Sequence, residues 1–236
     1  MKGLQLPLGV QLSDTASFET YFAGPNAEAV AAVRRAAEPT APPLLLLYGP
    51  PGTGKSHLLQ ALTRERARTV ACAYAPLREL VAEGASPADS LEGLERAQLV
   101  CLDDADAALR RADWALALLR LLDGLRAHGG RAVISAPAAP DRLELDLPDL
   151  RTRLAAAAIF GLKPLSDPDR TGLLLERARA RGLELPPEAA QHLLTQLPRD
   201  AGSLVQALDR LDRALLSAQR KLTLSFVQQW LKTSVD

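Results

Sequence analysis

The sequence predicts an α/β fold, a parallel β-sheet flanked by helices, followed by a small all-helical domain. Short apolar runs alternate with helical patterns up to about residue 163, which is the element order of a parallel sheet with crossover helices. Beyond that point only helical patterns follow. The 236 residues are 47% hydrophobic but only 4% aromatic, so the chain can bury a core, and a β-sandwich is disfavoured.

The residue pattern divides the chain into three segments. Residues 1–13 lack helical periodicity and contain Pro7 and Gly9, so we expect an exposed tail there. Residues 14–163 are expected to form the α/β domain. The helical domain should cover residues 164–236.

The first domain begins with an Ala-rich helical pattern over residues 28–38, which Pro39 ends. A strand buried on both faces is predicted at residues 44–48, because a leucine run is bounded there by prolines and a glycine. A glycine-rich turn and a helix over residues 55–66 follow. Further strands are predicted at 70–75, 99–102 and 131–136, with helical patterns between them, including one that carries Trp114, Leu118, Leu121, Leu122 and Leu125.

Four helices are predicted in the second domain, at residues 168–182, 187–197, 200–218 and 223–232. The third of them places leucines on one face, at spacings of four, three and four: Leu204, Leu208, Leu211 and Leu215. This stripe is too short for sustained heptads. We therefore interpret it as a core seam of the bundle rather than a coiled-coil partner site.

Charge and composition exclude several classes of protein. The 28 Lys and Arg residues balance 28 Asp and Glu residues, so no bulk electrostatic attraction draws the chain to DNA or to an anionic membrane. No apolar stretch is long enough to span a bilayer, and no secretory signal is evident. Cys72 and Cys101 lie in apolar runs and are interpreted as buried thiols. We expect a cytoplasmic protein without a zinc site, because its three histidines are scattered.

The strongest motif lies between the strand at 44–48 and the helix at 55–66. It reads Gly49, Pro50, Pro51, Gly52, Thr53, Gly54, Lys55 and Ser56, a complete phosphate-binding loop in the context that the motif requires. Its glycines let backbone N–H groups surround phosphates. Lys55 is expected to contact the β- and γ-phosphates, and the Ser56 hydroxyl to bind Mg²⁺.

A second element of this phosphate site is predicted at the end of the strand at 99–102. Asp103 and Asp104 follow that strand directly. We expect Asp103 to hold the magnesium, directly or through water. Asp104 is the candidate that polarises an attacking water.

These two motifs together resemble those of the AAA+ ATPases. Within them, the stretch Phe18 to Asn26 and the ending around Ala218 to Thr223 look like the family of the bacterial replication initiator DnaA, and in particular its Hda branch, which inactivates the initiator. The resemblance covers about residues 14–232. It leaves no room for the initiator's C-terminal DNA-binding domain.

The resemblance implies a five-stranded AAA+ domain followed by a helical lid. It also implies bound ADP or ATP with Mg²⁺, with Phe22 in the stretch that lies over the adenine and His57 beside the phosphate loop. The implied partners are DnaA itself and the β sliding clamp of DNA polymerase III, and DNA is contacted only through the clamp. The resemblance is also compatible with self-association of this chain into a homo-oligomer.

The tail contains a sequence similar to the clamp-binding motif of Hda. Gln5 could occupy a polar subsite, and Leu6, Leu8 and Val10 could contact an apolar groove. Taken without the family, the same residues indicate a loosely packed start. Gly9 and Val10 also depart from the bulkier apolar ending usual in such motifs.

Arg153, within the segment Leu150 to Leu154, aligns with the position at which DnaA relatives carry an arginine finger. Such a residue stabilises charge on a transferring phosphoryl group held by another subunit. Without the family it would be interpreted as an ordinary surface arginine. In Hda the finger is thought to act on ATP held by DnaA.

Two positions depart from the family pattern. Pro137 stands where the sensor 1 region usually carries a polar residue, and Gly202 stands where the sensor 2 arginine would touch a phosphate. Arg199 lies three residues before Gly202 and could substitute in part. These departures predict a chain that binds nucleotide and hydrolyses it poorly.

The sequence therefore predicts a negative regulator of replication initiation, which binds the DNA-loaded clamp and stimulates hydrolysis of DnaA-bound ATP. Intrinsic hydrolysis by the chain itself is expected to be weak or absent. Two alternatives stay open: an autonomous AAA+ ATPase or remodelling motor that uses Asp104 catalytically, and a helicase-loader-like protein that contacts DNA directly.

Overall fold

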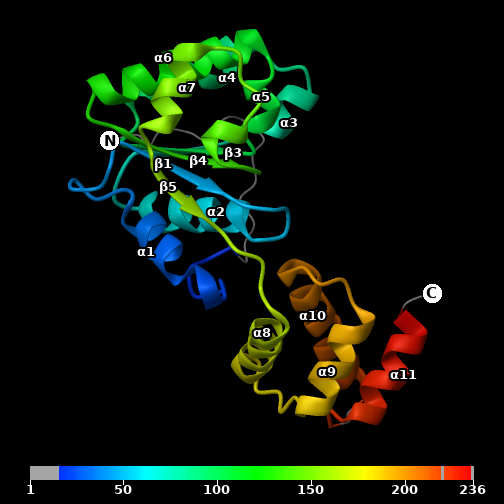
Figure 1. Cartoon of the computed structure of the whole chain (residues 1–236). Coiled ribbons are helices and arrows are strands. Elements are labelled where there is room, and N and C mark those ends of the chain that lie inside the picture. The colour runs from blue at the N-terminus through cyan, green and yellow to red at the C-terminus, as the bar shows by residue number, and fades with distance from the viewer. Residues whose placement is uncertain (1–15, 219–220, 235–236) are drawn as a thin grey trace. The chain divides into compact units, whose positions relative to one another are not determined.

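The computed structural model describes residues 16–218 and 221–234. It consists of two compact units, Met1–Lys163 and Pro164–Asp236 (Figure 1). The first unit holds the sheet, and the helices of the second unit pack around a core of their own.

The first unit is built on a five-stranded sheet of order β2-β3-β4-β1-β5, and every neighbouring pair is parallel. The strands are β1 (Leu44–Tyr48), β2 (Cys72–Pro76), β3 (Leu99–Asp103), β4 (Arg131–Ala136) and β5 (Ala158–Gly161). In register, Leu46 of the inner strand β1 lies opposite Ile134 of β4 on one side and Ile159 of β5 on the other. All five carboxyl ends therefore meet at one edge, and all five amino ends at the opposite edge.

Helices cover both faces of this sheet (Figure 1). They are α1 (Ala27–Arg35), α2 (Lys55–Arg66), α3 (Leu77–Ala82), α4 (Pro87–Leu91), α5 (Asp106–Leu109), α6 (Ala112–Ala127) and α7 (Pro148–Ala155). Short 3-10 turns add η1 (Gly24–Asn26), η2 (Leu94–Arg96) and η3 (Pro140–Arg142). The family's α/β architecture with a five-stranded parallel sheet is thus confirmed.

Successive residues of β1 face two separate cores, as the period of two in a strand requires. Leu44 and Leu46 pack with Trp114 and the other apolar residues of α6. Leu45 and Leu47 pack on the opposite face with α1 and α2. Both faces of β1 are buried, which explains why its sequence is a continuous leucine run.

The second unit contains α8 (Asp167–Ala180), α9 (Pro187–Gln196), α10 (Ala201–Ala218) and α11 (Leu224–Ser234). A capping box starts α8, since Ser166 accepts from the Asp169 N–H and Asp169 accepts from the Ser166 N–H. The leucine stripe of α10 is buried at all four positions. Its interpretation as a core seam is confirmed.

Three features outside the site also bear on the sequence expectations. Cys72 and Cys101 are free, buried thiols, and burial raises their pKa values to about 11 and about 12. The apolar pattern of the sequence does not predict the fifth strand, β5 (Ala158–Gly161).

Among the described residues, no helix combines the length and apolarity needed to cross a bilayer.

Candidate phosphate-binding site

The loop between β1 and α2 takes a conformation that depends on its glycines. Gly52 and Gly54 have φ angles of 78° and 88°, in the left-handed region, where other L-residues are strained. At Gly54 a Cβ atom would also meet Cε2 of Tyr21 at 2.5 Å. The loop therefore needs glycine at this position for two independent reasons.

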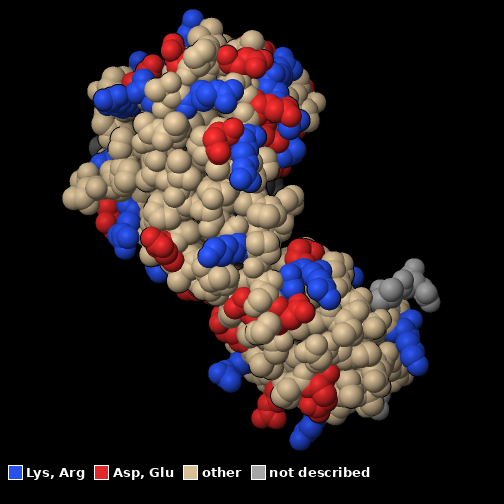
Figure 2. Space-filling view, viewed as in Figure 1, with Lys and Arg blue, Asp and Glu red and all other residues tan. Residues whose placement is uncertain are grey.

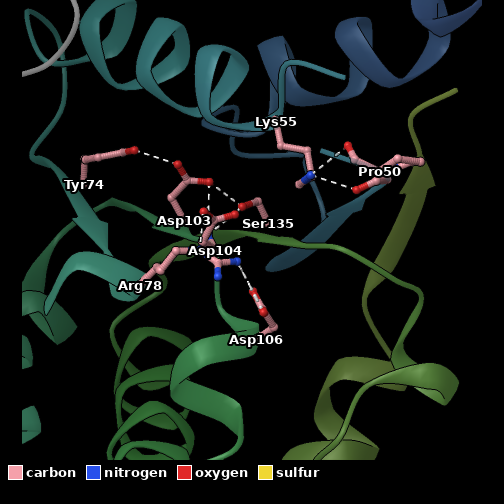
Figure 3. Close-up of polar contacts among 9 residues, drawn as sticks. Pro50, Lys55, Tyr74, Arg78, Asp103, Asp104, Asp106 and Ser135 are labelled. Atoms are coloured by element: carbon pink, nitrogen blue, oxygen red, sulfur yellow. Dashed lines mark hydrogen bonds and ion pairs between the residues drawn. The ribbon is translucent and has the colours of Figure 1, made fainter. Parts of the chain in front are cut away.

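Lys55, the first residue of α2, points back into this loop (Figure 3). Its Nζ donates hydrogen bonds to the carbonyl oxygens of Gly49 at 2.7 Å and Pro50 at 3.2 Å. Only 7% of the residue is exposed, and this burial lowers the pKa of Lys55, although Asp104 and Asp103 act in the opposite direction. A buried ammonium beside a helix N-terminus makes the loop a site for anions.

A segment before α1 lies against the same loop. The Tyr21 hydroxyl donates to the Thr53 carbonyl oxygen at 2.9 Å, and its ring lies 5.7 Å from the His57 ring, centroid to centroid. His57 Nε2 donates to the Ser17 carbonyl oxygen at 2.8 Å. The structure thus places His57 against this segment and Tyr21 on the loop, whereas Phe22 is half-buried. The role of Phe22 at the base stays a prediction.

Asp103 is the last residue of β3 and is 4% exposed, and three donors hold its carboxylate (Figure 3). The Tyr74 hydroxyl donates to Oδ2 at 2.7 Å. Oδ1 accepts from the Ser135 hydroxyl and from the Asp104 N–H. Burial, together with Asp103, raises the pKa of Tyr74, so this phenol stays protonated and donates. Asp103 is therefore fixed in orientation before any ligand arrives.

These residues fit a magnesium ion that is held mainly by phosphates. A carboxylate offers about four lone-pair positions, and three donors already use most of those on Asp103. No group of three or more His, Cys, Asp or Glu side chains suited to a metal occurs among the described residues. Mg²⁺ keeps several waters and needs only one or two protein ligands. Asp103, through a water, and Ser56 are adequate for that.

Asp104, the candidate for polarising water, is engaged by an arginine. Arg78 Nε donates to Asp104 Oδ2 at 3.0 Å, and its Nη2 donates to both carboxylate oxygens of Asp106, at 3.0 and 3.3 Å. These ion pairs raise the pKa of Arg78. Asp104 itself has a φ of 50°, which is uncommon for a residue other than glycine. The Asp104 carboxylate is thus directed toward Arg78 (Figure 3).

Arg153 lies away from the other candidate residues. It is in α7 and pairs with Asp123 of α6. Together with Leu44, Arg126 and Ala132 it lines a pocket at the amino-terminal ends of β1 and β4. The phosphate loop follows the carboxyl end of β1, about 13 Å along the strand. The structure therefore brings Lys55, Asp103 and Asp104 together and leaves Arg153 at the opposite edge of the sheet.

Gly202 and Arg199, the two candidate positions of the second unit, lie at or just before the start of α10. Gly202 is in the first turn of this helix, and Asp200 caps it by accepting from the Ser203 N–H at 2.8 Å. The Arg199 side chain is 70% exposed, and its Nη1 lies 3.9 Å from Asp167 Oδ1. Gln5, Leu6, Leu8 and Val10 lie outside the described residues.

The sequence did not predict the contacts that three residues make with Asp103 and Asp104, namely Tyr74, Arg78 and Ser135. Tyr74 and Ser135 lie inside apolar strands, where a lone polar residue could have signalled a buried hydrogen bond. Arg78 gives no such signal, because arginines are common along this chain. Only the pairing of β2 with β3 brings it to Asp104.

Comparison with known proteins supports this description. Residues 45–162 match the ATPase family associated with various cellular activities (AAA), and residues 167–231 match the Hda lid domain. An uncharacterized protein of Haemophilus influenzae is 37% identical over 231 residues, covering 96% of this chain and 98% of that protein.

Solved structures show the same fold at lower identity. Domain III of the replication initiation protein DnaA from Thermotoga maritima superposes with a TM-score of 0.76 at 21% identity, covering 95% of this chain and 98% of that one. AMPPCP-bound DnaA from Aquifex aeolicus gives 0.73 at 19% identity, covering 89% and 70%. The two family models cover the sheet-bearing unit and the helical unit in turn, and the chain belongs to the AAA+ ATPases as an Hda- and DnaA-like member.

Proposed function

We propose that this chain is a nucleotide-binding regulator that stimulates hydrolysis of ATP held by DnaA, and so represses replication initiation. It would bind ADP or ATP with Mg²⁺ at the loop around Lys55, and it would present Arg153 to the partner's nucleotide. Residues 5–10 would dock it on the DNA-loaded sliding clamp. Its DnaA- and Hda-like membership supports a role in this system.

The position of Arg153 is the observation that carries the proposal. An arginine side chain reaches only a fraction of the roughly 13 Å from the amino end of β1 to the phosphate loop, so Arg153 does not serve its own nucleotide. Its side chain is 31% exposed and paired with a half-exposed Asp123. Exposed ion pairs of this kind contribute at most about 1 kcal/mol. The guanidinium can therefore leave Asp123 for a phosphate on another molecule.

The state of Asp104 supports weak hydrolysis at the chain's own site. Arg78 Nε donates to Asp104 Oδ2, so this oxygen is already occupied and is less available to accept from an attacking water. Gly202 has no side chain at the position where the resemblance to the DnaA family implies a sensor 2 arginine. The bound nucleotide then acts as a structural ligand that stabilises the first unit.

The experiment that tests the proposal is single-turnover hydrolysis of ATP preloaded on DnaA, with and without clamp-loaded DNA. We expect acceleration only when both the chain and the loaded clamp are present. Replacing Gln5 and Leu8 together by alanine should remove the clamp dependence and reduce the rate at least tenfold, as expected when local concentration on the clamp is lost. Equal acceleration by this double variant would contradict the clamp assignment.

A second prediction concerns Arg78. Replacing it by alanine should raise the chain's own slow ATP hydrolysis about fivefold, because releasing Asp104 from a half-exposed ion pair is worth about 1 kcal/mol. Arg111→Ala is the matched control, since Arg111 forms a comparable exposed pair with Asp113 on the same unit. Steady-state phosphate release measures both variants. A fall in the rate for Arg78→Ala would show instead that Arg78 positions Asp104 productively.

The autonomous ATPase is the second candidate, and the intact set Lys55, Asp103 and Asp104 favours it. A motor of this kind would turn over ATP rapidly without DnaA, and Asp104→Asn would abolish that turnover. The helicase-loader alternative requires direct DNA contact. Binding to DNA in a gel shift without the clamp would favour that alternative.

A further inference from the structure

The pocket beside Arg153 has a composition suited to one kind of partner. Apolar side chains form part of its wall, from Leu44, Leu122, Leu125 and Ala156. Two cationic residues, Arg126 and Arg153, also line the pocket. The pocket holds about 240 Å³, the volume of about eight water molecules. It can therefore accept one large apolar side chain.

The two arginines of this pocket are not equivalent. Arg153 pairs with Asp123. Arg126 is in the last turn of α6, exposed, and within the described ranges no ion pair involves it. Figure 2 shows basic side chains over the region of α6 and α7, next to uncharged surface. This leaves Arg126 available for an anionic group supplied from outside.

We propose that this pocket is the docking site for the ATP-bearing partner, and that it takes an apolar side chain flanked by a carboxylate. The inference rests on the proposed function, because it assigns how the partner whose ATP is hydrolysed is recognised. The partner's apolar side chain fills the pocket, and its carboxylate pairs with Arg126. Arg153, beside the pocket, then exchanges Asp123 for the partner's γ-phosphate.

Charge complementarity and geometry together favour this occupant. Arg126 and Arg153 line one pocket, so a partner seated there is held within reach of the finger residue. A free small anion would gain nothing from the apolar wall, whereas an apolar segment without a carboxylate would leave Arg126 unpaired. Partly desolvated interfacial charge pairs commonly fix orientation as well as affinity.

The test measures binding of the full chain to ATP-loaded DnaA in the presence of clamp-loaded DNA, together with single-turnover hydrolysis. Ala156→Trp fills the pocket from an exposed position, and Arg126→Glu reverses its charge. We expect each variant to weaken binding at least tenfold. Arg120→Glu, an exposed arginine of α6 that does not line the pocket, should bind within threefold of the unchanged chain.

Two readouts separate the docking inference from the proposed function. Binding of the two pocket variants tests the docking site, and the hydrolysis rate that the unchanged chain stimulates tests the function. Normal binding by both Ala156→Trp and Arg126→Glu would overturn the docking site and leave the function intact. If the unchanged chain bound DnaA through the pocket without accelerating hydrolysis, the proposed function would be contradicted and the docking site would be retained. No binding by the unchanged chain would reject both. Melting temperatures check that each variant is folded.

Discussion

Replacing Arg153 by alanine should slow the stimulated hydrolysis of DnaA-bound ATP about a thousandfold, the lower end of what an arginine supplied in trans contributes. Nucleotide binding by the chain itself should not change, because Arg153 lies at the opposite edge of the sheet from Lys55. Single-turnover measurements with ATP preloaded on DnaA give the rate. Equilibrium titration with ADP gives the affinity.

Arg151→Ala is the matched control for this prediction. Arg151 is an exposed arginine of the same helix, α7, and it donates to the Leu145 carbonyl oxygen. The control should keep at least half of the stimulated rate. A loss of only twofold or threefold in Arg153→Ala would show that this side chain is an ordinary surface arginine.

Replacing Lys55 by methionine should weaken nucleotide binding at least about a hundredfold. A hydrogen bond from a charged donor contributes about 1.5–3 kcal/mol, and Lys55 is expected to supply such bonds to two phosphates. The fold should survive. Methionine loses the bonds to Gly49 and Pro50, but it also avoids the cost of a buried charge, which is evident in the lowered pKa of Lys55.

Fluorescent ADP titration measures this effect, and thermal melting without nucleotide checks the fold. Lys163→Met is the control, since Lys163 is an exposed lysine of the same unit and should bind ADP normally. In the unchanged chain ADP should raise the melting temperature, and in Lys55→Met this rise should vanish. An unaltered rise in Lys55→Met would remove the loop from the nucleotide site.

Much of the first unit could be predicted from sequence because strands β1 to β4 are buried on both faces. A run such as Leu44 to Tyr48 between prolines and glycines has few alternatives to a central parallel strand. The boundaries of α2 and β4 are those predicted, since a glycine precedes each of them and fixes where it begins. The phosphate loop followed from a motif with a defined mechanism.

The fifth strand could not be located in the same way. β5 lies at the edge of the sheet, pairs only with β1, and alternates between half-buried and exposed residues. It follows a run of alanines, which are strong helix formers. This segment is a strand because it pairs with residues Leu45 to Tyr48 of β1 at the edge of the sheet. Such long-range pairing cannot be inferred from the composition of the segment itself.

The partners of Asp104 illustrate a similar limit at the site. The sequence identified Asp103 and Asp104 because they end a buried strand. It gave no indication that Arg78, 26 residues earlier, would hold Asp104. Such a contact follows from the strand order, in which β2 lies next to β3. Tyr74 joins Asp103 for the same reason.

The most direct test of action on a partner's nucleotide measures which protein's bound ATP is hydrolysed. ATP labelled at the γ-phosphate is loaded either on DnaA or on this chain, and the two are mixed on clamp-loaded DNA with unlabelled nucleotide on the other protein. We predict fast release of labelled phosphate when DnaA carries the label and slow release when this chain carries it. Fast release from the label on this chain, with slow release from DnaA, would contradict the account and show an autonomous ATPase.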